Sequence, residues 1–175
     1  MRLSNLADRI RDFLKSGHAR LEPIELRGFV GKFAERYGDL GESGIVFDLE
    51  LPGDALPPAL AEADVEKLLT ALDDLVRNAI EAVAGQPEGE RRISIRLSRA
   101  DRFWKLTIAD SGPGVPPELA GRIFDPFFTT KEKGSGIGLP LARSLIEACG
   151  GSLVYERGQK GEGAVFVLSL RAIQD

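Results

Sequence analysis

The sequence predicts an α+β fold, a two-layer sandwich in which helices back a mixed, largely antiparallel sheet, with a short helix at the N-terminus. One observation behind this is a long amphipathic segment, residues 64–83, whose apolar residues recur at i, i+3, i+4 and i+7. Another is a pair of segments, residues 92–98 and 103–110, in which apolar and polar residues alternate. Only a short turn separates them, which is typical of two adjacent antiparallel strands. Helices and strands are mixed along the chain, which favours one layer of each.

The remaining elements follow in chain order. Leu3, Leu6, Ile10 and Phe13 form an apolar seam with heptad spacing, so a first helix is expected before Ser16-Gly17. An extended linker precedes Pro23, because a residue before proline disfavours the helical region. We expect a second helix over residues 24–37 and a strand over 45–51. Asp64 is the expected N-cap of the long helix. A Gly- and Pro-bearing loop at 111–138, a helix at 139–149 and a hairpin at 152–170 complete the chain.

Composition excludes several classes of protein. The 175 residues carry a net charge of −4, which gives no reason to expect nucleic-acid binding. A single cysteine, Cys149, excludes an internal disulfide, and a single histidine, His18, excludes the usual histidine-rich metal sites. No apolar run approaches the roughly 18 residues of a spanning helix, so we expect no direct membrane insertion and a cytoplasmic location.

One flank of the helix at 64–83 carries polar groups beside small residues. On a helical wheel Asp74, Asn78 and Glu81 lie together with Ala71 and Ala82, at the edge of the apolar arc. Asp74 and Asn78 are neighbours at i and i+4, and oxygens of these types suit Mg²⁺. The alternative is a solvated polar face.

Asp110 ends an apolar row. Trp104, Leu106, Ile108 and Asp110 share one strand face, and an SGPG turn follows. A buried carboxylate needs a partner. It could accept a hydrogen bond from the exocyclic amine of a purine, or it could simply cap the turn.

The loop between this strand and the next helix holds two further features. Gly134, Gly136 and Gly138 precede a helix, where free N–H groups can receive an anion. Between the glycine clusters lie three phenylalanines together with lysines, in the stretch IFDPFFTTKEK. Long loops of this kind are often lids, in which aromatic side chains anchor the loop and lysines reach phosphates. The alternative is a surface loop over a small satellite core.

In this order, DDLVRNAIEA, DSGPG, FDPFFTTK and GSGIGLPLA resemble the N, G1, F and G2 boxes of sensor histidine kinases. These kinases share an ATPase superfamily with gyrase B, Hsp90 and MutL. The resemblance covers residues 65–151 and is greatest to the nitrogen-sensor branch. It implies the Bergerat-type ATP-binding fold, with ATP and Mg²⁺ as ligands.

The resemblance also implies residue roles. Asn78, Lys131 and Asp74 would act in catalysis, with Asn78 and Asp74 holding Mg²⁺ and Asp110 binding the adenine amine. Gly112 and Gly114 would shape the adenine pocket. The remaining nucleotide contacts would come from the F and G2 boxes: Phe124, Thr129, Thr130, Lys131, Gly134, Ser135, Gly136, Gly138 and Leu139.

Three departures from the family pattern stand out. Asp74 replaces the usual Asn, and could orient a water as hydrolytic relatives do, although Mg²⁺ ligation beside Asn78 is the favoured reading. Ala164 replaces a Thr or Ser of the adenine pocket, which should weaken nucleotide binding modestly. His18 is followed by Ala19 and not by an acidic residue, so it is not expected to be the phosphate acceptor.

The resulting hypothesis is a histidine protein kinase catalytic domain that gives the γ-phosphoryl group of Mg-ATP to a histidine outside this chain. Residues 1–16 would be the tail of a dimerisation helix that could pair with a second copy, residues 17–23 a linker, and 24–175 the catalytic domain. A histidine-bearing dimerisation domain and a response regulator are the expected partners. The alternatives are a stand-alone ATPase or anti-sigma-type serine kinase, and a binding module that uses nucleotide only as a conformational signal or not at all.

Overall fold

A computed structural model describes residues 18–53, 57–131, 134–159 and 163–173. The predicted helix before Ser16 lies outside these residues. The elements, in chain order, are β1 (Glu22–Glu25), α2 (Leu26–Glu35), η1 (Gly38–Ser43), β2 (Val46–Glu50), β3 (Leu60–Ala63), α3 (Val65–Val83), β4 (Arg92–Ala100), β5 (Phe103–Asp110), η2 (Ala120–Arg122), α4 (Gly138–Ala148), β6 (Ser152–Arg157) and β7 (Ala164–Arg171).

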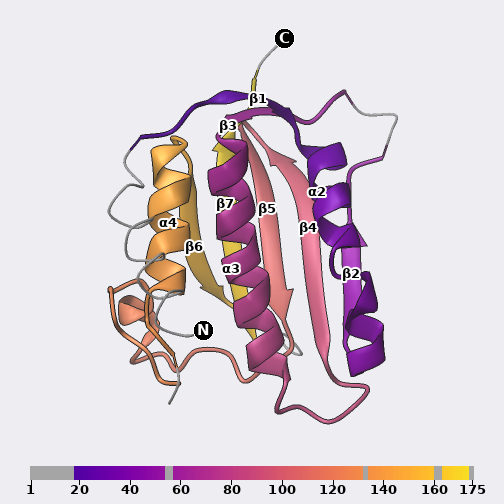
Figure 1. Cartoon of the computed structure of the whole chain (residues 1–175), viewed down its shortest axis with the longest axis vertical. Coiled ribbons are helices and arrows are strands. Elements are labelled where there is room, and N and C mark those ends of the chain that lie inside the picture. Colours follow the sequence, from indigo (N-terminus) through magenta and orange to yellow (C-terminus); the bar gives the residue numbers. More distant parts are fainter. Residues whose placement is uncertain (1–17, 54–56, 132–133, 160–162, 174–175) are drawn as a thin grey trace.

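The main sheet has five strands in the order β2-β4-β5-β7-β6. Only β2 and β4 run parallel, and the other neighbours are antiparallel, so the sheet is mixed as predicted. Figure 1 shows α2, α3 and α4 covering one face of this sheet. The predicted two-layer α+β sandwich is confirmed.

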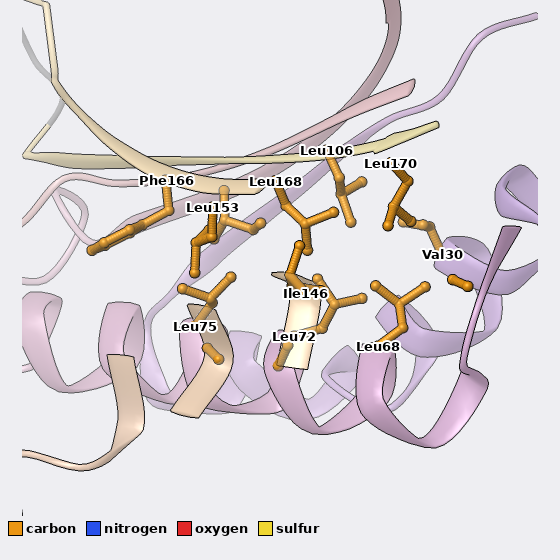
Figure 2. Close-up of a cluster of buried hydrophobic side chains, with 14 of the residues drawn as sticks. Val30, Leu68, Leu72, Leu75, Leu106, Ile146, Leu153, Phe166, Leu168 and Leu170 are labelled. Atoms are coloured by element: carbon orange, nitrogen blue, oxygen red, sulfur yellow. The ribbon is translucent and has the colours of Figure 1, made fainter. Parts of the chain in front are cut away.

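Apolar side chains of the strands and helices form the core between these layers. Figure 2 shows Leu68, Leu72 and Leu75 of α3 pointing toward Leu168 and Phe166 of β7. The predicted apolar arc of α3 is buried, because its spacing matches the helical repeat. Alternate residues of a strand point to the same face of the sheet. Asp110, the last residue of β5, therefore lies on the same buried face as Leu106 and Ile108.

The helix boundaries follow from capping. The Asp64 side chain accepts a hydrogen bond from Lys67 N at 3.1 Å, which confirms it as the N-cap of α3. The second helix begins at Leu26 and not at residue 24, because the Glu25 side chain accepts hydrogen bonds from Gly28 N at 2.8 Å and from Ala59 N at 3.0 Å. These hydrogen bonds lower the pKa of Glu25 despite the opposing effect of its burial.

Two short strands did not follow from the sequence pattern. β1 pairs antiparallel with β3, in the register Glu22↔Ala63, and these two strands form a separate small sheet. Within the expected linker, the chain is already part of β1 from Glu22 onward. The strand sequences EPIE and LAEA contain residues of low strand propensity, and the pairing that holds them is long-range.

Candidate functional site

A cavity of about 880 Å³ opens between α3 and the segment that joins β5 to α4. In Figure 1 this segment runs from the lower end of β5 to the lower end of α4. The volume falls in the range of small-molecule sites, which is roughly 300–1,000 Å³. The lining residues are Asp74, Arg77, Asn78, Glu81, Ala82, Asp110, Pro113, Gly114, Val115, Pro116, Leu119, Ile123, Phe128, Thr129, Thr130, Lys131, Gly134, Ser135, Gly136, Gly138, Leu139, Ala164 and Phe166.

Asp110 lines the cavity and is a buried residue, only 4% exposed. Its Oδ1 atom accepts hydrogen bonds from Gly112 N at 2.8 Å and from Ala164 N at 3.2 Å. Burial raises the pKa of Asp110, while these N–H groups and the charge of Lys131 oppose that rise. Asp110 therefore anchors the turn after β5 and also presents a carboxylate to the cavity, so the two readings of the sequence are compatible.

Gly112 explains how the turn after β5 approaches α3. A Cβ atom at Gly112 would lie 2.9 Å from the Ala82 Cβ and 2.9 Å from Asp110 Oδ1. Only glycine leaves room for this contact, and Ala82 is the small residue on the helix that makes it possible. Gly112 itself does not line the cavity, but its N–H holds the Asp110 carboxylate by a hydrogen bond.

A second polar group lies on the exposed side of α3. Lys131 Nζ donates to Asn78 Oδ1 at 2.7 Å and to Glu81 Oε2 at 2.6 Å. Lys131 belongs to the loop, and its backbone N–H donates to Thr129 Oγ1 at 3.1 Å, which fixes the local turn. Two oxygens of α3 therefore converge on one cation.

Asp74 lies one turn before Asn78 on the same flank, as predicted. It is 5% exposed and forms a very close ion pair with the half-exposed guanidinium of Arg77. Either role expected for Asp74, as Mg²⁺ ligand or as water-orienting base, requires its carboxylate to act beside this positive charge. Sequence reasoning did not single out Arg77, although it stands between Asp74 and Asn78.

The aromatic residues of the loop divide into two groups. Phe124 and Phe128 pack against the core, with Arg143 4.9 Å from the Phe124 ring centre and Arg122 4.4 Å from that of Phe128. Phe127 is 67% exposed. Phe124 and Phe128 therefore serve as anchors of the loop.

The end of the loop leads into α4. Phe127 N donates to the carbonyl oxygen of Gly136 at 2.9 Å, and Gly136 has φ +65°. Gly138 and Leu139 then begin α4, whose N-cap residue Ile137 provides no side-chain acceptor. Helix N–H groups at such a position are suited to an anion.

Most residues expected to bind a ligand line this one cavity, although they come from α3, β5 and the loop. The two exceptions are Gly112 and Phe124, which support the walls. Sequence reasoning missed the apolar side of the cavity. It is formed by Val115, Pro116, Leu119, Ile123, Phe128 and Phe166. Phe166 belongs to β7, and only the sheet register brings it next to Asp110, because its pairing partner in β5 is Ile108.

The chemistry of this cavity matches an adenine nucleotide with a divalent cation. A buried carboxylate beside apolar side chains suits a purine, and the lining also includes Lys131 and the first residues of α4. The Lys131 ammonium shows that Asn78 and Glu81 oxygens can share a cation. Carboxamide and carboxylate oxygens are also ligands of Mg²⁺.

A family model described as histidine kinase-, DNA gyrase B-, and HSP90-like ATPase matches residues 63–174. The chain belongs to this ATPase family. The match covers α3, the loop and strands β4 to β7, which include all the residues that line the cavity. Domains of this family bind ATP, and every residue that lines the cavity lies within the matched range.

The relatives of the domain are sensor kinases. It is 33% identical over 136 residues to the nitrogen regulation protein NtrY of Azorhizobium caulinodans, covering 76% of this chain and 17% of that protein. It is 33% identical over 189 residues to the sensory histidine kinase/phosphatase NtrB of Rhizobium leguminosarum bv. phaseoli, covering 99% of this chain and 47% of that protein. The chain thus spans less than half the length of these relatives.

The solved structures that resemble this chain also include histidine kinases. The catalytic domain of histidine kinase ThkA has a TM-score of 0.74 and 28% identity, with 87% of this chain and 95% of that chain covered. Full-length ShkA in complex with AMPPNP has a TM-score of 0.81 and 25% identity, with coverage of 99% and 37%. The chain is therefore similar to the catalytic domains of two-component sensor kinases, and these comparisons do not match the alternative of a stand-alone ATPase or anti-sigma kinase. None of the helices within the described ranges has the length and apolarity needed to cross a membrane.

The Gly136 position offers a first test of the loop. We expect Gly136→Ala to lower ADP affinity about tenfold, because a side chain at positive φ costs about 1–2 kcal/mol. In addition, its Cβ would lie 2.7 Å from the Phe127 Cα. Calorimetric titration measures the effect. Gly121→Ala is the matched control, since a Cβ there meets nothing within 4 Å. Equal ADP affinity of the two variants would contradict the role of Gly136.

Proposed function

We propose that this domain binds Mg-ATP in the cavity between α3 and the loop and supplies the γ-phosphoryl group to a histidine on a dimerisation domain. The observation that carries the proposal is that one cavity is lined both by the buried carboxylate of Asp110 and by the more exposed Asn78 and Lys131, which contact each other. An adenine nucleotide matches these two features. Its base has apolar faces and an exocyclic amine that a carboxylate can bind, and its phosphates carry the negative charge that a lysine can bind.

At the adenine end, Asp110 would accept a hydrogen bond from the exocyclic amine. The Oδ1 atom accepts hydrogen bonds from Gly112 N and Ala164 N, so the protein itself fixes the orientation of the carboxylate. Apolar side chains such as Ile123 and Phe166 would exclude water from the base. Ala164 has no hydroxyl to assist, which supports modest affinity and not tight binding.

At the phosphate end, Lys131 and the N–H groups at the start of α4 would neutralise and orient the phosphates. Asn78 would hold Mg²⁺ through its carboxamide oxygen, with Asp74 as a nearby second ligand. In that place these two residues would hold Mg²⁺, which would supply positive charge to offset the charge that develops during phosphoryl transfer. The residues of the chain thus position the nucleotide and compensate its charge, which is the protein's main contribution to such reactions.

The acceptor histidine belongs to another segment. His18 is the only histidine of the chain, and it is exposed and followed by Ala19. We propose residues 24–175 as the catalytic domain, 17–23 as the linker and 1–16 as the tail of a dimerisation helix that can pair with a second copy. A response regulator is the proposed downstream partner, since one solved neighbour is ThkA in complex with the response regulator TrrA.

The test is calorimetric titration of the chain with ADP and with AMPPNP, each with and without Mg²⁺. We expect adenine-selective binding, and Mg²⁺ should strengthen AMPPNP binding. The chain is then mixed with a histidine-bearing dimerisation domain from a similar kinase and ATP. Acid-labile, base-stable phosphorylation of that domain is the expected product.

Two results would contradict the proposal. Absence of adenine nucleotide binding would remove the cavity as an ATP site of this chain. Steady release of phosphate without any partner, or phosphorylation of a serine, would show that the nucleotide is used for a different reaction. In that case the Asp74 carboxylate would be the residue to examine as a base.

A further inference from the structure

Lys131 is held by groups that a bound nucleotide would also need. Its ammonium nitrogen lies 2.7 Å from Asn78 Oδ1 and 2.6 Å from Glu81 Oε2. Asn78 and Glu81 are three positions apart on α3, so both project from the same face of the helix. Lys131 comes from the loop, and this pair of contacts closes the loop onto α3.

Glu81 is not among the residues to which the proposed function assigns a role in nucleotide binding. It lines the cavity, and its side chain is 50% exposed while that of Lys131 is 42% exposed. Its carboxylate neutralises the lysine that the cavity would offer to phosphates. It also adds a negative charge at the end of the cavity where phosphates would lie.

We propose that Glu81 is a positioning residue that holds Lys131 across Asn78 in the nucleotide-free chain, and that a nucleotide's phosphates must take Lys131 from Glu81 in order to bind. This inference rests on the proposed function, because it concerns the same cavity. Glu81 thereby sets the affinity for the phosphates without touching the base. It also keeps the Asn78 oxygen occupied by Lys131 until the phosphates arrive.

The sign of the effect distinguishes this role from that of a metal ligand. If Glu81 competes for Lys131, Glu81→Gln raises the affinity for Mg-AMPPNP by about two- to fivefold, the range expected for a half-exposed ion pair. Adenosine has no phosphates, so its affinity stays the same. If Glu81 instead ligates Mg²⁺ together with Asn78, Glu81→Gln lowers the affinity for Mg-AMPPNP.

The experiment compares the full chain with its Glu81→Gln and Glu88→Gln variants by calorimetry with Mg-AMPPNP, ADP and adenosine. Glu88 is exposed in the turn after α3 and provides the same change of charge away from the cavity. The pair Glu81→Gln and Lys131→Met completes a double-mutant cycle. We expect Glu81→Gln to lose most of its effect on Mg-AMPPNP affinity when Lys131 is already methionine.

Hydrogen exchange of the nucleotide-free chain tests the contact without any ligand. Amides of residues 128–131 are expected to exchange faster in Glu81→Gln than in the wild type or in Glu88→Gln. Unchanged exchange, a lower Mg-AMPPNP affinity, or an equal change for adenosine would each overturn the inference. If the wild type binds nucleotide and Glu81→Gln does not change the affinity for Mg-AMPPNP, the inference about Glu81 is overturned and the proposed function is not affected. If no nucleotide binds the wild type, the proposed function fails, and the exchange experiment still decides the contact.

Discussion

Asn78→Ala is expected to remove the strengthening of AMPPNP binding by Mg²⁺. Asn78 supplies the carboxamide oxygen that contacts the Lys131 ammonium, and no other carboxamide lines the cavity among the described residues. Loss of a contact to a charged group costs about 1.5–3 kcal/mol, so the affinity for Mg-AMPPNP should fall about tenfold to a hundredfold. Calorimetry with and without Mg²⁺ measures both quantities.

The fold should tolerate this change. Asn78 lies in the middle of α3 and is half-buried, and alanine has a higher helix propensity than asparagine. Thermal unfolding of Asn78→Ala should therefore occur at or slightly above the wild-type temperature. Glu81→Gln, which removes the negative charge beside Lys131, is the control that should retain the Mg²⁺ dependence. If Asn78→Ala keeps that dependence as well, Asn78 is not the Mg²⁺ ligand.

Asp110→Asn is expected to abolish the selectivity for adenine while leaving the fold intact. The asparagine oxygen can still accept from Gly112 N and Ala164 N, which leaves an NH₂ group where the carboxylate faced the ligand. That group cannot accept from the exocyclic amine of adenine. Adenosine affinity should fall about tenfold to a hundredfold, as for the loss of a hydrogen bond to a charged group. Inosine, which has a carbonyl oxygen in place of the amine, should lose less.

Stability separates the two roles of Asp110. Burial raises the pKa of Asp110, which means that the site disfavours the ionised form, so the neutral asparagine should cost little stability. Asp110→Ala leaves two backbone N–H groups without their acceptor, and we expect a loss of about 1–3 kcal/mol. Chemical denaturation of the two variants gives these values. If Asp110→Asn binds adenosine like the wild type, the residue serves only to anchor the turn.

The sequence predicted the features that depend on local patterns. The repeat of apolar residues located α3 and its buried face, and Asp64 marked the start of that helix. The alternation in residues 92–98 and 103–110 located β4 and β5, since one face of each strand is buried. The candidate site was predicted through residue types in a fixed order, and most of its members line the same cavity.

Other features depend on contacts between distant parts of the chain. The small sheet of β1 and β3 joins residues 22–25 to residues 60–63, and neither strand has a local signal that identifies it. The parallel pairing of β2 with β4 also requires the intervening helix to cross over, so the sequence could predict a mixed sheet but not its order.

The sequence by itself thus determined the layers of this domain, because helical and strand periodicity are local properties. Through the order of its motifs it also identified most of the polar residues and glycines that line the cavity. Only the tertiary structure decided how those side chains meet. Lys131 reaches Asn78 across 53 positions of sequence, and Glu81 joins them, since α3 and the loop pack against each other. Gly112 and Phe124 do not line the cavity: Gly112 lies against Ala82 of α3, and the Phe124 ring packs edge-to-face on Phe166 of β7.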